Sequence, residues 1–396
     1  MKTLNKIVIT HLDNEIMKSA TVMAYYDNDV ITDFSCYYDD EESLVGNIYL
    51  GYVKDIAKNI NAAFIEIADG IKGYLPLEES NYAIFANNKN TDKLCQGDKV
   101  IVQVTKDAIK TKDAVLTTKI SLAGRYSCIT HGDLRVSVSK KIKDEEFTNA
   151  LKEMSNSIDL SRFGVIFRTN SYGVSFDDIN KEINELALKY DEITSYGVMR
   201  PGKTCLYKKE NPILTELRDK INDNEIIVIT DNTSLHKEIS DMFLAYGIEN
   251  VVKLYDDDYE LYKLYCLTTL VSNISAKKVW LKSGGYLIIE ETEALTSIDV
   301  NTGKYDKGSN KEAAILKINM EAAEEIARQL RLRNLSGIII VDFINMTLPE
   351  NMAKLISFTK CELAKDHIQS SFVDITKLGL MEITRKKIRE PFRLKK

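Results

Sequence analysis

Three features of the sequence predict an α/β multidomain protein that contains a β-barrel. Between residues 46 and 120, five short β-prone runs are separated by turn residues. This pattern is typical of an OB-fold barrel. Between residues 205 and 280, helical and strand patterns alternate, as in α/β proteins. The length of 396 residues corresponds to two or three domains.

The expected elements follow in chain order. Short strands at 6–9 and 21–25 flank a turn. The barrel strands are expected at 47–54, 61–67, 73–77, 99–104 and 114–119. Residues 121–204 form a mixed segment, with strands at 136–139 and 164–168 and a helix at 177–188. The next segment has helices at 213–221 and 234–246 and strands at 225–230, 251–254 and 278–281. The last has strands at 286–290, 294–300, 337–342 and 372–374, with helices at 311–332 and 349–364.

Composition excludes some classes of protein. The formal net charge is −6 and the pI about 5.5, which argues mildly against a uniformly basic nucleic-acid coat but not against a local basic groove. Residues 384–396 carry seven basic side chains and one acidic, which indicates either a solvated end or a contact with a polyanion. We expect no membrane partner, because no stretch approaches 18 apolar residues.

The six cysteines, at positions 36, 95, 128, 205, 266 and 361, form no C-x-x-C pair. The sequence therefore encodes neither a zinc ribbon nor a redox motif of that kind. Single cysteines in a chain without an apolar N-terminal leader predict a reducing, cytoplasmic location.

Two aspartates share one context. Asp299 and Asp342 each end an apolar, strand-like run, at the sheet edge where α/β proteins bind ligands. If the strands are neighbours, the carboxylates converge, and such a pair suits Mg²⁺, with Mn²⁺ as the alternative ion. Asn301 could orient one ligand or a water. The alternative for each aspartate is that it caps a helix or a turn at the end of its strand.

Two further motifs each have two interpretations. Phe64 and Tyr74 lie on adjacent expected barrel strands, and their rings belong either to the core or to a base-stacking platform. Residues 197–204 match the P-loop pattern G-x-x-x-x-G-K-[ST]. A P-loop requires a helix that begins at the Lys-Thr pair, whereas the next helix is expected only at Pro212. We interpret this match as chance.

Long stretches of the sequence resemble one known family. Residues 282–301 (KSGGYLIIEETEALTSIDVN) and 321–346 (EAAEEIARQLRLRNLSGIIIVDFINM) are similar to the catalytic signature of the ribonuclease E/G family. Residues 46–51 (GNIYLG), 62–64 (AAF) and 73–76 (GYLP) resemble its OB-fold module, and 378–385 (LGLMEITR) resembles the end of its catalytic core. The similarity runs over nearly the whole chain.

The resemblance implies four parts: an RNase H-like subdomain (1–39 and 205–280), an OB-fold (40–120), a 5′-sensor (121–204) and a DNase I-like catalytic subdomain (281–396). It implies an endoribonuclease that cuts single-stranded RNA in RNA processing and decay. The residues implied are Asp299 and Asp342 as ligands of a catalytic Mg²⁺, Asn301 in support, Phe64, Tyr74 and Lys112 as RNA contacts, and Arg168 and Thr169 as the reader of a 5′-monophosphate.

The sequence also departs from the family pattern. It lacks the C-x-x-C zinc link that joins two protomers, so we expect no zinc site, and any homo-oligomer would form without one. Asn345 and Glu290 each replace an aspartate, Gln369 replaces a basic residue, and Cys128 replaces an apolar residue beside the sensor. These departures leave a rival hypothesis open: a non-catalytic or weakly catalytic RNA-binding protein of the same fold.

Overall fold

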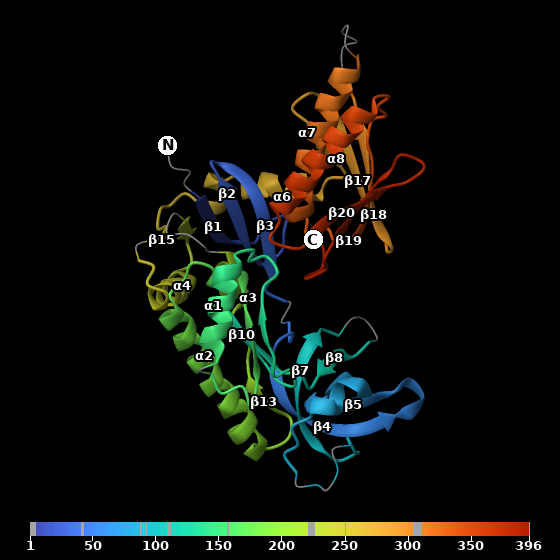
Figure 1. Ribbon diagram of the computed structural model, residues 1–396. Helices are drawn as coiled ribbons and strands as arrows, with labels where there is room; N and C mark the ends of the chain where they lie inside the picture. Colours follow the sequence, from blue (N-terminus) through green and yellow to red (C-terminus); the bar gives the residue numbers. More distant parts are fainter. Residues whose placement is uncertain are drawn as a thin grey trace. The chain divides into compact units, whose positions relative to one another are not determined.

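The computed structural model describes residues 5–40, 43–87, 89, 91, 93–108, 112–156, 158–220, 226–249, 251–303 and 311–395. The chain divides into two compact units (Figure 1). One unit comprises Met1–Glu41 and Asp223–Lys396, and the other comprises Glu42–Asn222. Each unit is built around its own sheets, so each is described separately.

The 42–222 unit contains a closed five-stranded barrel. Its strands are β4 (Ile48–Ala57), β5 (Ala62–Ala68), β6 (Ile71–Pro76), β7 (Lys99–Lys106) and β8 (Ala114–Thr117). They follow the order β4-β5-β6-β8-β7, and pairing of β4 with β7 closes the barrel. Gly73 allows β6 to approach β8 closely, because a Cβ atom there would collide with the Leu116 side chain. The OB-like barrel expected from the sequence is therefore present.

The described part of this unit also contains a small sheet and three α-helices. The sheet has the order β11-β12-β10-β9. Its strands are β9 (Ser121–Ala123), β10 (Ser127–Thr130), β11 (Val136–Val138) and β12 (Gly164–Phe167). The helices are α1 (Glu145–Ser155), α2 (Phe176–Asp191) and α3 (Pro212–Lys220). The P-loop-like segment leads into a strand, β13 (Thr204–Tyr207), which pairs with β4. Because no helix begins at Lys203, the interpretation of that match as chance is confirmed.

The other unit begins with a five-stranded sheet of order β15-β14-β1-β2-β3. Its strands are β1 (Asn5–Leu12), β2 (Ala20–Asp27), β3 (Val30–Tyr38), β14 (Ile226–Thr230) and β15 (Val252–Leu254). The helices that follow in the chain are α4 (Thr233–Ala245), α5 (Leu261–Leu264) and α6 (Leu267–Ser275). Because β14 joins β1 in parallel, two segments far apart in the sequence form one sheet.

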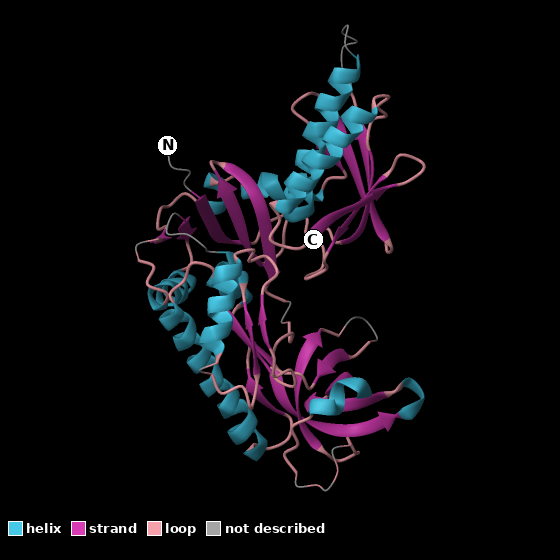
Figure 2. Ribbon diagram, viewed as in Figure 1, coloured by secondary structure: helices cyan, strands magenta, loops and turns pink. Residues whose placement is uncertain are grey.

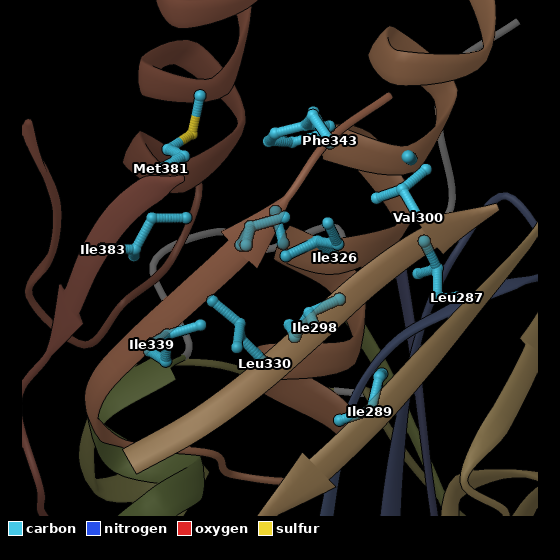
Figure 3. Packing of buried hydrophobic residues seen from close by; sticks show 14 of the residues in the cluster. Leu287, Ile289, Ile298, Val300, Ile326, Leu330, Ile339, Phe343, Met381 and Ile383 are labelled. Atoms are coloured by element: carbon cyan, nitrogen blue, oxygen red, sulfur yellow. The ribbon is translucent and has the colours of Figure 1, made fainter. Parts of the chain in front are cut away.

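The same unit contains a six-stranded sheet of order β16-β17-β18-β19-β21-β20. Its strands are β16 (Lys278–Trp280), β17 (Tyr286–Glu291), β18 (Leu295–Asn301), β19 (Gly337–Asp342), β20 (Ser370–Ile375) and β21 (Met381–Arg385). Helices α7 (Lys311–Leu332) and α8 (Pro349–Ala364) lie on one side of it (Figure 2). Apolar side chains such as Ile298, Ile339 and Leu330 fill the space between sheet and helices (Figure 3).

Burial alternates along these strands. In β18, Thr296, Ile298 and Val300 are buried, whereas Asp299 is exposed. The buried set faces α7 and α8. The burial of each large apolar side chain stabilises the fold by roughly 1.5–3 kcal/mol. The opposite face therefore carries the polar residues at the carboxyl end of β18.

The basic C-terminal segment packs against its own unit. Phe392 contacts Phe34 edge to face at 5.4 Å, and Arg385 is buried in an ion pair with Asp366. Further contacts of its basic side chains are Arg389 with Tyr37 and Ser35, Arg393 with Glu291 and Lys395 with Asp40. The solvated end expected from the sequence is therefore found only in part. These contacts hold Arg385, Arg389 and Lys395, whereas Lys386, Lys387 and Arg393 are exposed. Contact with a polyanion stays a prediction.

No helix among the described residues is long and apolar enough to cross a membrane.

Candidate functional site

The two aspartates lie side by side at the carboxyl ends of neighbouring strands. Strands β18 and β19 run parallel, and Asp299 and Asp342 are direct partners in their register. Neighbouring strands are about 4.8 Å apart, and residues opposite each other point to the same face. Both side chains are exposed. The structure thus brings together the two carboxylates on the sheet face that α7 and α8 leave open.

Asn301 belongs to the same group. Its Nδ2 atom donates a 2.6 Å hydrogen bond to Oδ2 of Asp299. Among the described residues, neither carboxylate has an ion-pair partner within 4.0 Å. Two neighbouring carboxylates without a counter-charge repel each other, and a bound cation relieves that repulsion.

The donor set fits a magnesium ion. Mg²⁺ is commonly held by one or two carboxylates and keeps several waters. Over the described parts of the chain, no group of three or more His, Cys, Asp or Glu side chains is placed to hold a metal. The Asp299–Asp342 pair is smaller than such a cage, and an ion there would retain open positions for a substrate.

A buried amide holds the segment that follows Asp342, and the sequence analysis missed it. Asn319, on α7, is fully buried. Its Nδ2 donates to the Ile344 carbonyl oxygen at 2.8 Å, and its Oδ1 accepts from the Ile344 amide at 3.1 Å. The clamp fixes the backbone two residues beyond Asp342. A single polar residue on the apolar face of the expected helix was the only signal.

Glu312 fixes the next part of the same segment. Its carboxylate accepts hydrogen bonds from the backbone amides of Thr347 and Leu348 and from the Thr347 hydroxyl, at 3.0 to 3.1 Å. The amide of Leu348, with the Thr347 donors, lowers the pKa of Glu312. Helix α7 thus contributes two side chains that hold the loop after β19.

The predicted RNA-contact residues of the barrel lie on its surface. Phe64 on β5 and Tyr74 on β6 are partners in the register, with ring centroids 6.2 Å apart. Both are half-buried, and neither belongs to the barrel core. Lys112 is exposed and comes two residues before β8, which runs parallel to β6. The rings therefore lie outside the barrel core, and base stacking on them stays a prediction.

Arg168 lies directly after β12 and forms a bidentate ion pair. Its Nη1 and Nη2 atoms donate to the two carboxylate oxygens of Asp219 at 2.7 and 2.8 Å, and Nη1 also donates to the Gly124 carbonyl. Burial opposes the charge, but the Asp219 carboxylate outweighs it and raises the pKa of Arg168. The exposed Thr169 hydroxyl is 2.8 Å from that of Ser139. The sequence analysis missed Asp219, which is 51 residues away.

Glu182 supports the loop beside this arginine. Its carboxylate accepts hydrogen bonds from the backbone amides of Arg125, Tyr126 and Ser127, and from the Ser127 hydroxyl, at 2.6 to 2.9 Å. One carboxylate therefore holds three successive residues, the last of which begins β10. Burial raises the pKa of the nearby Cys128 thiol, so this thiol stays neutral at physiological pH.

Comparisons with known proteins agree on one family. A sequence model described as the ribonuclease E/G family matches residues 121–388. Ribonuclease G of Salmonella typhimurium is 30% identical over 387 residues, which cover 95% of this chain and 79% of the relative. Ribonuclease G of Haemophilus influenzae is 32% identical over 365 residues, covering 88% and 74%. Ribonuclease E of Escherichia coli is 29% identical over 389 residues, covering 95% and 37%.

Proposed function

Because the chain belongs to the ribonuclease E/G family, we propose that it is a Mg²⁺-dependent endoribonuclease that cuts single-stranded RNA. The observation that carries this proposal is the pairing of Asp299 with Asp342 across parallel strands, with Asn301 bonded to the first. The pair offers hard oxygen ligands on an exposed face, where a phosphodiester has access.

In this proposal Asp299 and Asp342 hold the ion, and Asn301 holds the Asp299 carboxylate in one orientation. A magnesium ion so bound would polarise the phosphoryl oxygens and lower the pKa of a water for attack on phosphorus. Water adds across the phosphodiester as the bond from phosphorus to the 3′ oxygen breaks. The products are a 5′-phosphate and a 3′-hydroxyl.

The barrel and the small sheet supply RNA contacts in the same proposal. Phe64 and Tyr74 stack bases, since aromatic surfaces accept any base, and Lys112 contacts the backbone. Arg168 and Thr169 read a 5′-monophosphate, because a guanidinium and a hydroxyl both donate to phosphate oxygens. The Asp219 carboxylate, which now pairs with Arg168, would compete with that phosphate.

The remaining family expectations are part of the proposal. The β15-β14-β1-β2-β3 sheet corresponds to the RNase H-like subdomain, and the sheet that carries Asp299 to the DNase I-like subdomain. We place the protein in the cytoplasm, and four exposed free cysteines fit a reducing compartment.

The test is cleavage of a 5′-monophosphorylated, AU-rich single-stranded oligonucleotide with Mg²⁺ and with the ion removed by a chelator. We expect cleavage only with the ion, and products that carry a 5′-phosphate. Tight binding without cleavage at any Mg²⁺ concentration would favour the rival, a non-catalytic RNA-binding protein.

A second assay tests the sensor. Arg168→Ala should lower the ratio of cleavage rates for 5′-monophosphorylated and 5′-hydroxyl RNA. The matched control is Arg135→Ala, because Arg135 is an exposed arginine of the same unit that pairs only locally with Asp133. An unchanged ratio in Arg168→Ala would contradict the assignment.

A further inference from the structure

An exposed aromatic cluster lies on β16 and β17, at one edge of the six-stranded sheet that carries Asp299 and Asp342, here called the catalytic sheet. Trp280, on β16, has 65% of its surface exposed. Its ring meets that of Tyr286, on β17, edge to face at 5.4 Å. The Nζ atom of Lys278 lies 3.8 Å from the Trp280 ring centroid and 3.7 Å from that of Tyr286. We call these three residues the Trp280 cluster.

Strand register places this cluster beside the carboxylates. Lys278 is opposite Ile288, Ile288 opposite Asp299, and Asp299 opposite Asp342. These four residues form one row across four strands.

A second row, two residues along the strands, contains Trp280, Tyr286 and Asn301. Residues opposite each other share a face, so both rows lie on the exposed face. With strands about 4.8 Å apart, Trp280 is roughly 10 Å from Asn301.

The chemistry of the cluster matches a nucleobase. An exposed indole offers a flat π-face on which any base can stack, and a lysine beside the rings adds positive charge for the RNA backbone. An apolar partner surface would not favour the positive charge of the lysine that lies between the two rings. The carboxylates in the adjacent row repel phosphate, so a base contact beside them helps to keep the strand in place.

We propose that the Trp280 cluster is a base-stacking subsite for single-stranded RNA next to the cleavage site. This inference rests on the proposed function, since it assigns the strand that Asp299 and Asp342 act on. It adds a contact within the catalytic sheet, separate from Phe64 and Tyr74 in the barrel. The base binds by stacking on Trp280 while Lys278 faces the phosphate.

Trp280 is the only tryptophan in the chain, so its emission reports on this subsite alone. A cleavage-deficient Asp342→Asn protein would be titrated with a ten-nucleotide single-stranded RNA and with an abasic ribose-phosphate chain of the same length. End-label anisotropy follows saturation in both titrations. We expect the RNA to quench the tryptophan and the abasic chain to leave it unchanged. Saturation by RNA without quenching would overturn the subsite.

Variants supply a second readout. Trp280→Ala should raise KM for a short single-stranded substrate roughly tenfold with kcat unchanged, the size expected for one lost base stack. Trp280→Phe should retain most of the affinity because it keeps a ring. Tyr259→Ala is the matched control, since Tyr259 is an exposed aromatic residue of the same unit outside this sheet. A KM for Trp280→Ala equal to that of wild type would overturn the proposal.

The outcomes separate this inference from the function on which it rests. Cleavage by wild type, with no quenching and an unchanged KM in Trp280→Ala, refutes the subsite and leaves the ribonuclease intact. Quenching by RNA in a protein that never cleaves refutes the ribonuclease and retains the subsite. If Trp280→Ala instead converts a dimer to a monomer in sedimentation, with unchanged RNA affinity, the cluster is a protein interface and the proposal fails.

Discussion

The two hydrogen bonds that Asn319 makes to Ile344 determine how much stability the protein should lose when this side chain is replaced. In Asn319→Leu the side chain keeps nearly the same volume, so the loss of hydrogen bonds is separated from the creation of a cavity. Both bonds to Ile344 disappear, and its partly buried amide and carbonyl groups lose this partner. An unsatisfied buried group costs about 1–3 kcal/mol. We expect the free energy of unfolding to fall by about 2–4 kcal/mol after partial relaxation.

Urea titration followed by circular dichroism measures this loss. Lys317→Ala is the matched control, because Lys317 is exposed on the same helix and both lysine and alanine favour helix. This substitution should change the free energy of unfolding by no more than about 0.5 kcal/mol. Asn319→Leu should also cleave RNA more slowly, because the segment after Asp342 is no longer fixed. Stability and cleavage rate both equal to wild type would refute the role assigned to Asn319.

Three further predictions concern other parts of the chain. Phe64→Ala should weaken the binding of single-stranded RNA by roughly five- to a hundredfold, as measured by anisotropy. Ile71→Ala, which truncates an exposed residue of β6, is the control and should change the RNA affinity little. His131 is partly buried, which lowers its pKa. The unfolded state therefore takes up the proton first, and the free energy of unfolding should fall as the pH drops below about 6.5. His131→Gln should reduce this dependence on pH. Asp366→Ala should cost about 3–5 kcal/mol in a denaturant titration because it leaves Arg385 buried without its carboxylate, and an effect below 1 kcal/mol would contradict that reading.

The long elements of the catalytic sheet could be predicted from the sequence. Helices α7 and α8 and strand β19 have the expected bounds of 311–332, 349–364 and 337–342. Their apolar periodicity is long and unambiguous, and Pro349 occupies the first turn of α8. Strands β3 and β21 were missed. Each mixes polar with apolar residues, and β21 spans only five residues, so the pattern alone did not separate either from a loop.

The candidate site was predicted in part. The strand-end context of Asp299 and Asp342 indicated a shared edge, and the parallel pairing of β18 with β19 makes them partners. The Trp280 cluster was not foreseen, because its proximity to Asn301 depends on the register of β16, β17 and β18. Asp219 was missed for the same reason, since only the fold brings it to Arg168. Sequence patterns locate residues on elements, whereas contacts between elements require the register.

The most direct test of the account measures the cleavage rate of Asp299→Asn and Asp342→Asn together with their affinity for RNA. Asp374→Asn serves as the control, because Asp374 is an exposed carboxylate on β20 of the same sheet. We predict a loss of cleavage on the order of a hundredfold or more in the first two variants, with RNA affinity retained and Asp374→Asn fully active. Cleavage at the wild-type rate by either Asp299→Asn or Asp342→Asn would contradict the claim that this carboxylate pair carries the chemistry.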